Sequence, residues 1–408
     1  MHVFRLPRAF AGLALLGPAL AFAQPAQPSA PQATLHILVE NAWQRSPQVR
    51  TLEARQDEAA AGLALADSWL ASAPTLGILQ RTDQWTDRHE RRESEISLSA
   101  PIWTPGQKAR RTDLANASAN ELASQLAQAK LEISGQVRTR LWQARAAKEI
   151  EIERADHWSH LQELANDVER RVKAGDLARS DVLLASQEVS LAHSNFIAAR
   201  TDAKAALARF SVLTGMTTLP DVEIEPVAPS GEPIPLRLQA ARAAELRARA
   251  AIAAVRAQPA SAPTVAVSMR RERDGVGMPN DRSIGIALQI PLIGQQRNRP
   301  AEAAATTQLA SASADLAQLE AQAQADIALA RDRLADAEEA LRLAEQRAGA
   351  MQEHTRLFDK AFAAGERALP ELLRSRILSH EAQIALRQQR VALGMARAEL
   401  NQALGIIP

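Results

Sequence analysis

Histidines are the side chains in this sequence whose spacing comes nearest to a metal site. His157 and His160 lie three residues apart, so a helix would place both on one face. Two ligands make an incomplete site, because zinc usually takes three or four from the protein. Farther along, His380-Glu381 begins like a His-Glu-x-x-His motif, but Ile384 stands where the second histidine belongs. We therefore expect surface histidines, with no metal site.

The composition excludes several classes of protein. With 48 Lys and Arg against 47 Asp and Glu in 408 residues, the chain lacks the basic excess typical of nucleic-acid binding. It has no Cys, which excludes disulfides, thiolate metal sites and a lipid anchor on an N-terminal cysteine. Aromatic residues make up only 3%, whereas rings dominate burial in compact enzyme cores. The sequence also has neither a phosphate-binding glycine loop nor a nucleophile elbow, so we expect a non-enzyme without catalytic residues or a cofactor.

The first 23 residues have the pattern of a signal peptide. Arg5 and Arg8 precede an apolar run, and Ala21-Phe22-Ala23 offers a small-x-small cleavage site. The apolar run is too short for a transmembrane helix, which needs about 20 residues. We expect residues 1–23 to direct export and residues 24–34, rich in Pro, Gln and Ala, to be disordered. Any membrane role would then need a β-barrel or a surface helix.

The chain contains an internal duplication with a period of 190 residues. Three pairs of matching residues share this spacing: Pro101 and Pro291, Gly175 and Gly365, and Gly215 and Gly405. We infer a first structural repeat over residues 35–220, a linker over 221–235 and a second repeat over 236–408.

Each repeat is expected to carry a helix followed by two strands. Apolar and polar residues alternate over residues 75–80 and 94–102, which is the period of a strand with one apolar face. The same alternation recurs around Val267 and over residues 284–292. The charged segments between the strands, residues 83–92 and 272–282, are predicted to be connectors.

A long helical hairpin follows each pair of strands. After Pro105 no proline occurs until Pro220, and apolar residues recur at three-, four- and seven-residue steps. This pattern predicts one helix from Pro105 to about Val172, a turn at Gly175 and a returning helix. The second repeat is expected to turn in the same way.

Four strands cannot close a barrel, because even small barrels need about eight. Three copies would supply twelve strands, whereas two copies would supply eight; we expect a trimer. The predicted fold class is mainly α with a small β part. Long antiparallel helical hairpins would form an α-barrel, and four strands per chain would contribute to a trimeric twelve-stranded transmembrane β-barrel.

Two kinds of segment carry a family resemblance. The strand-to-helix junctions are residues 100–108 and 290–297, and the turns of the helical hairpins are residues 174–181 and 364–367. In these segments, and in its duplicated element order over about residues 35–407, the chain resembles the TolC-type outer-membrane efflux channels of Gram-negative bacteria. Its length, its lack of a lipidation cysteine and its junctions look most like the cobalt–zinc–cadmium, or heavy-metal, branch.

The resemblance implies a homotrimer in the lipid of the outer membrane that extends into the periplasm. It implies a passive channel, to which an inner-membrane efflux pump delivers substrate through a periplasmic adaptor, or membrane fusion protein. Heavy-metal cations are the expected substrate, with drugs or other small molecules as the alternative. Two competing hypotheses are an elongated periplasmic adaptor-like protein and a periplasmic metalloenzyme. The two helical hairpins and two strand pairs favour the channel.

The hairpin turns are the first candidate site. Gly175 and Gly365 suit a left-handed turn between antiparallel helices. The resemblance implies that these exposed turns dock the adaptor, with Leu177 and Ala368 offering small apolar contacts. The alternative is that the turns only reverse the chain.

A periplasmic gate latch is the second candidate site. Ser180, Asp181 and Arg367 match family positions whose polar links hold the tunnel closed. An Asp–Arg pair is a charge-assisted contact that can be broken, as a gate requires. Because an exposed pair contributes only about 0–1 kcal/mol, the latch would need to be repeated around the trimer. The alternative is a set of solvated surface charges.

Overall fold

The computed structural model describes residues 34–83, 91–227, 234–258, 262–292 and 298–408. The expected signal peptide and all but the last residue of the expected disordered segment lie outside these residues. The same is true of part of the expected linker and of most of the second strand-to-helix junction.

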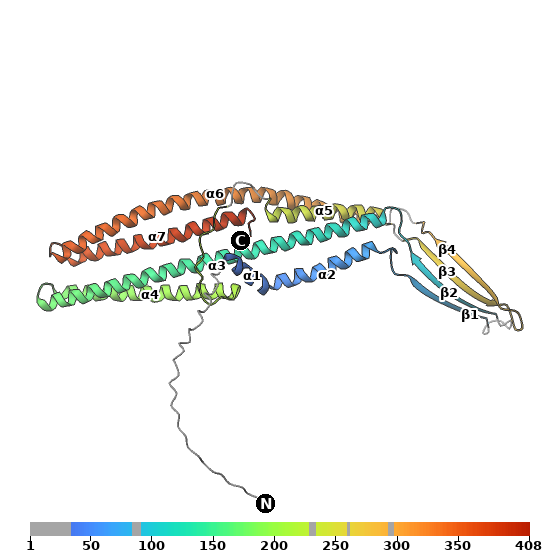
Figure 1. Cartoon of the computed structure of the whole chain (residues 1–408), viewed down its shortest axis with the longest axis horizontal. Coiled ribbons are helices and arrows are strands. Elements are labelled where there is room, and N and C mark those ends of the chain that lie inside the picture. Colours follow the sequence, from blue (N-terminus) through green and yellow to red (C-terminus); the bar gives the residue numbers. More distant parts are fainter. Residues whose placement is uncertain (1–33, 84–90, 228–233, 259–261, 293–297) are drawn as a thin grey trace, which may run out of the picture. The chain divides into compact units, whose positions relative to one another are not determined.

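One order of elements occurs twice, namely a helix, two antiparallel strands and two long helices, and a further short helix, α1, precedes the first copy (Figure 1). The elements are α1 (Leu35–Arg45), α2 (Pro47–Asp67), β1 (Thr75–Thr82), β2 (Arg92–Pro101), α3 (Gln107–Ala174), α4 (Arg179–Thr214), α5 (Leu236–Ala257), β3 (Thr264–Arg273), β4 (Asp281–Gln289), α6 (Arg299–Ala363) and α7 (Leu369–Ala403). The architecture is mainly α with a small β part, as predicted.

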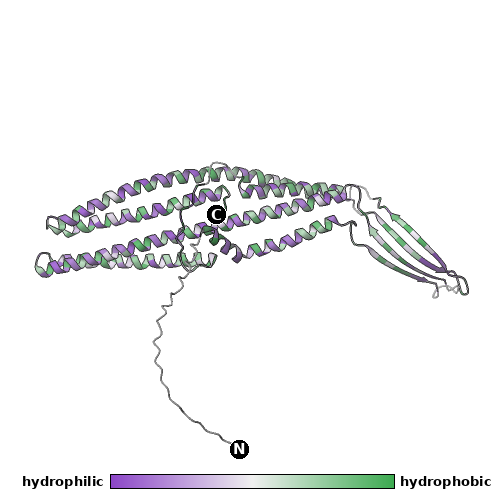
Figure 2. Ribbon diagram, viewed as in Figure 1, coloured by the Kyte–Doolittle hydropathy of each residue, from purple (hydrophilic) through white to green (hydrophobic). Residues whose placement is uncertain are grey.

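The helix boundaries follow from proline and glycine. Pro47 occupies the first turn of α2 and separates it from α1, because a residue without an N–H fits only where no helical bond is required. Helix α3 has 68 residues, about 100 Å at 1.5 Å per residue, and ends where Gly175 takes a left-handed conformation. Both of its observed bounds lie two residues later in the chain than predicted. Apolar and polar residues alternate in patches along these helices (Figure 2).

The two helical hairpins, α3–α4 and α6–α7, pack side by side near their turns. A shared apolar cluster takes residues from all four helices: Leu161, Leu164, Val168, Ala185, Ala192, Phe362, Leu369, Leu372 and Leu373. A second cluster packs α1 and the start of α2 against the middle of α3 and the end of α4, around the fully buried Phe210. Burial on one stripe of each helix, rather than a single globular core, therefore holds the hairpins together.

The strands form one antiparallel sheet in the order β1-β2-β3-β4. The pairing of β2 with β3 joins the two repeats, with Leu98 opposite Val267. The sheet presents one apolar face, whose large side chains are exposed: Leu76, Ile78, Ile96, Leu98, Val267, Met269, Ile284, Ile286 and Leu288. In the described part of the chain, no helix is apolar over a length sufficient to cross a membrane.

The strands extend farther into the charged segments than the sequence predicted. β2 begins at Arg92, β3 continues to Arg273 and β4 begins at Asp281, so the expected connectors 83–92 and 272–282 were too long. The reason is that ladder pairing uses backbone groups, and Glu93 pairs opposite Glu272 despite their polarity. β4 ends at Gln289, short of the predicted residue 292.

Candidate docking, gating and wall sites

The first hairpin turn is built around Gly175. Its φ of 91° lies in the left-handed region, which costs glycine little and other residues about 1–2 kcal/mol. Its N–H donates to the Val172 carbonyl (3.1 Å) and the Asp176 N–H donates to the Arg171 carbonyl (2.9 Å). These bonds satisfy carbonyls at the end of α3 and aim the chain back along α4.

The second turn repeats this geometry at Gly365, whose φ is 76°. Its N–H donates to the Phe362 carbonyl (3.0 Å), and the Glu366 N–H donates to the Ala361 carbonyl (2.9 Å). Both glycines are exposed, and no heavy atom lies within 4 Å of an added Cβ at either. The conformation, rather than crowding, therefore requires glycine at both turns.

The predicted docking contacts differ in exposure. Ala368, the residue that precedes α7, is exposed. Leu177 is half-buried and packs against the apolar cluster shared by the two hairpins. Ala178, the counterpart of Ala368 in the first repeat, precedes α4 and is also exposed. The exposed apolar surface of the turns is thus formed by small residues.

The predicted latch residues do not pair within one chain. The Asp181 carboxylate accepts a hydrogen bond from the Ala178 N–H (3.1 Å), which caps the start of α4. Arg367, in the turn before α7, pairs with Glu371 in the first turn of that helix (3.2 Å) and lies 5.5 Å from the Phe358 ring. Ser180 is exposed. An Asp181–Arg367 contact between neighbouring copies stays a prediction.

Sequence reasoning missed a polar cluster that joins α3 to α7. The His380 ring is buried and lies between two side chains of α3. Its Nδ1 faces Glu153 Oε1 (3.1 Å), and Arg154 Nη1 faces its Nε2 (3.2 Å). Because the arginine can only donate, Nε2 accepts in the neutral ring, whose proton then lies on Nδ1. Arg387 closes the cluster with bonds to Glu153 (2.9 Å) and Glu149 (2.8 Å).

The expectation of surface histidines is correct for His160 and wrong for His157. His160 is exposed, but His157 is half-buried and stacks on the His380 ring with a centroid distance of 3.8 Å. The partner lies more than 200 residues away, so helix spacing could not reveal it. Two arginines border the cluster, and nowhere in the described chain do three His, Asp or Glu side chains converge as a metal site would require.

This environment lowers two pKa values. Burial, followed by the nearby charges of His380 and Arg154, lowers the pKa of His157 to about 3, and Glu153 opposes this only in part. Burial raises the pKa of Glu153, but the hydrogen bonds and charges of His380 and Arg387 outweigh it and bring that pKa below its ordinary value. Both shifts therefore make the folded state more stable at neutral pH than in acid.

Acid is expected to destabilise the fold through His157. Between pH 6.5 and about 3 the unfolded chain binds a proton that the folded ring resists, so stability falls as pH falls. The loss from pH 7 to pH 4 should be about 1–2 kcal/mol, reduced by the partial exposure of the ring. His157→Phe, which keeps an aromatic ring for stacking, should flatten the pH dependence of urea unfolding. His160→Phe should not change it; an equal effect of both would contradict this account.

The two faces of the sheet differ in a way that suits a channel wall. The register places Leu76, Leu98, Val267 and Ile286 in one row across the apolar face. The opposite face carries a row of small residues in the next register position: Gly77, Ser97, Ser268 and Gly285. A side chain on Gly77 would approach the Ser97 hydroxyl within 2.6 Å. Small polar residues on one face and large apolar residues on the other are typical of a barrel strand between lumen and lipid.

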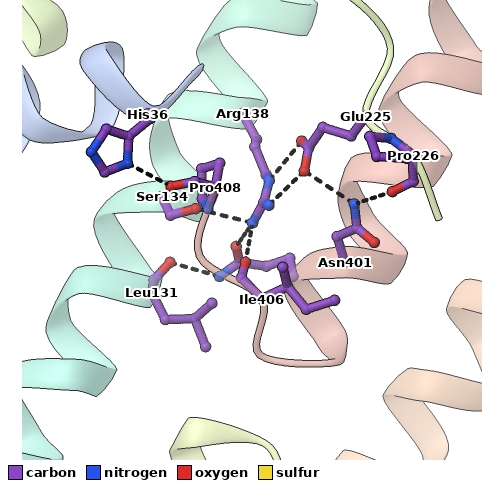
Figure 3. Close-up of polar contacts among 10 residues, drawn as sticks. His36, Leu131, Ser134, Arg138, Glu225, Pro226, Asn401, Ile406 and Pro408 are labelled. Carbon is purple, nitrogen blue, oxygen red and sulfur yellow. Dashed lines mark hydrogen bonds and ion pairs between the residues drawn. The ribbon is translucent and has the colours of Figure 1, made fainter. Parts of the chain in front are cut away.

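A buried arginine, Arg138, ties three distant chain segments together (Figure 3). It donates to both carboxylate oxygens of Glu225 (2.8 and 2.6 Å), a residue between α4 and α5. It also donates to the Gln402 side chain (2.7 Å) and to the Ile406 carbonyl (3.0 Å) near the end of the chain. Its side chain is only 3% exposed. The signal in the sequence is an arginine on an apolar helix face, where the second repeat has Ala328.

Comparison with known proteins agrees with this architecture. Residues 38–216 match the family model of the outer membrane efflux proteins. The search among curated proteins gave no match. The fold is similar to that of VceC, an outer membrane protein of Vibrio cholerae (16% identity, TM-score 0.72), covering 91% of this chain and 96% of VceC.

Two other channels are similar over nearly their whole length. The CmeC outer membrane channel of Campylobacter jejuni is 13% identical with a TM-score of 0.72, covering 98% of this chain and 94% of CmeC. CusC, whose structures concern transmembrane channel formation, is 14% identical with a TM-score of 0.73, covering 95% of this chain and 96% of CusC. These likenesses confirm the predicted fold class: the chain has the fold of a TolC-like channel protomer.

Proposed function

We propose that this protein is the outer-membrane channel of a tripartite efflux system in a Gram-negative bacterium. The observation that carries the proposal is the sheet, which has one exposed apolar face, one face of small and polar residues, and a direct connection to long helical hairpins. The match of residues 38–216 to the outer membrane efflux proteins and the fold of TolC-like channels support it. In an adaptor-like protein of the periplasm this apolar sheet face would be exposed to water, which is unfavourable.

The sheet of one chain needs neighbouring copies. β1 and β4 are its two edges, and an edge strand leaves backbone N–H and C=O groups without partners. In a membrane each such group costs several kcal/mol, so the edges must pair. Three copies joined β4 to β1 make twelve strands, and the homotrimer closes both the barrel and the helical tunnel around one axis.

Heavy-metal cations are the proposed substrate. The sheet face opposite the apolar one carries four carboxylates, Glu93, Glu95, Glu272 and Asp281, against two arginines, Arg81 and Arg270. A lumen with this acidic excess favours cations over anions. The channel supplies the path, while an inner-membrane pump supplies energy through a periplasmic adaptor that meets the hairpin turns. Drugs and other small molecules are the second candidate substrates.

Electron microscopy of the detergent-solubilised protein tests the assembly. We expect a hollow three-fold cylinder more than about 100 Å long, since α3 alone has that length. A monomeric or dimeric rod without a barrel would refute the channel and favour the adaptor-like alternative.

Deleting the gene tests the substrate. We expect the deletion strain to become at least several-fold more sensitive to zinc, cobalt or cadmium, and the plasmid-borne gene to restore resistance. Loss of antibiotic tolerance with unchanged metal tolerance would establish the drug-efflux alternative.

A further inference from the structure

Four arginines gather at the end of the apolar sheet face that is farthest from the helices. They come from three strands: Arg92, Arg271, Arg273 and Arg282. Strand alternation places them on the same face as Ile96, Met269 and Ile284. The strands are apolar toward the helices and hydrophilic at this end (Figure 2).

The arginines lie directly opposite one another. Arg92 pairs with Arg273 across β2 and β3, and Arg271 pairs with Arg282 across β3 and β4. Like charges at directly opposite positions, with Cβ atoms about 5 Å apart, destabilise a sheet unless an anion neutralises them. Two such pairs in adjacent rows concentrate four positive charges in one small area.

The face supplies no counter-charge of its own. Among the strand residues that the structure describes, none on this face is Asp or Glu. None of the four arginines has an ion pair to a described residue, and Arg273 Nε is buried without a hydrogen-bond partner. On the other face, by contrast, Arg270 lies 2.9 Å from both Glu93 and Glu272.

The position of the arginines relative to the apolar rows indicates that they lie at the membrane surface. Arg271 follows Met269 by two residues, about 7 Å along the strand, so the arginines begin where the apolar band ends. On a sheet face that contacts lipid, arginine is tolerated at the membrane surface and disfavoured at the midplane. Because the helices leave the opposite end of the sheet, this end faces the outer leaflet.

We propose that Arg92, Arg271, Arg273 and Arg282 form a belt that binds the phosphate groups of anionic lipids in the outer leaflet. The inference rests on the proposed function, since it requires the sheet to span the outer membrane. Guanidinium groups bind phosphate bidentately, and their long apolar stems can lie along the lipid while the heads reach the surface. In the trimer the belt has twelve arginines.

Native mass spectrometry of the trimer in a non-ionic detergent tests the belt. The purified protein is titrated with dioctanoyl phosphatidic acid, dioctanoyl phosphatidylcholine or inorganic phosphate, and bound molecules are counted. We expect phosphatidic acid to bind at least tenfold more tightly than phosphatidylcholine, and its binding to weaken as salt is raised. R271Q/R282Q should reduce it about tenfold, whereas R271K/R282K should retain most of it.

The matched control removes two arginines from the other face. R81Q/R270Q should leave binding of phosphatidic acid unchanged. Equal binding of the two lipids, or equal loss in R271Q/R282Q and R81Q/R270Q, would overturn the belt. Saturation by inorganic phosphate at the same concentration would show a free-anion site and also overturn it. In each case an intact trimer in the spectrum would leave the proposed channel function unaffected. A missing trimer in the wild type would contradict the proposed channel function itself.

Discussion

Replacing Arg138 with Met is expected to lower the free energy of unfolding by about 3–5 kcal/mol. The substitution leaves the Glu225 carboxylate, whose side chain is 11% exposed, without its bidentate partner. Removing one member of a buried pair is costly because the remaining charge keeps its desolvation penalty. Met has a similar length and fills most of the space, so the lost charge rather than a cavity should dominate. Urea unfolding followed by helical circular dichroism measures the change.

Two further variants distinguish the effect of losing the ion pair from the effect of a substitution in α3 itself. Arg140 lies two residues away on an exposed face of α3, where its guanidinium bonds Gln143, and Arg140→Met should change stability by less than about 0.5 kcal/mol. The double variant R138M/E225M should recover part of the loss, because no unpaired charge remains. A loss below about 1 kcal/mol in R138M, or no recovery in the double variant, would contradict a stabilising role for the Arg138–Glu225 pair.

Placing aspartates on the hairpin turns is expected to abolish export without harming the fold. Ala178 and Ala368 are exposed residues at the N-caps of α4 and α7. Aspartate is a preferred N-cap residue, so A178D/A368D should leave the helices as stable or more stable. If small apolar contacts at these turns dock the adaptor, two carboxylates per chain should reduce metal resistance at least several-fold, to the level of the deletion strain.

The comparison variant is Ala350→Asp, an exposed residue of α6 away from the turn. We expect it to retain resistance, and crosslinking should still capture the adaptor. Trimer levels in the outer membrane must be equal in all strains. Full resistance in A178D/A368D at normal trimer levels would mean that the turns only reverse the chain.

The local pattern of the sequence determined most of the elements. Proline set the start of α2, glycine set the end of α3, and period-two alternation located all four strands. The strand ends were less predictable, since backbone pairing carried β2, β3 and β4 into charged segments. That error concealed the arginine belt, because Arg273 and Arg282 share a face only once both are in strands.

The sequence by itself determined the helical hairpins, the strand faces and the left-handed turns at Gly175 and Gly365, since each depends on residues near in the chain. Only the tertiary structure decided which distant residues meet. His157 stacks on His380, and Arg138 holds Glu225 and Gln402, across separations of 87 to 264 residues that no periodicity encodes. Such contacts follow from how the hairpins pack, because a helix face selects a neighbouring helix but does not select the individual partner on it.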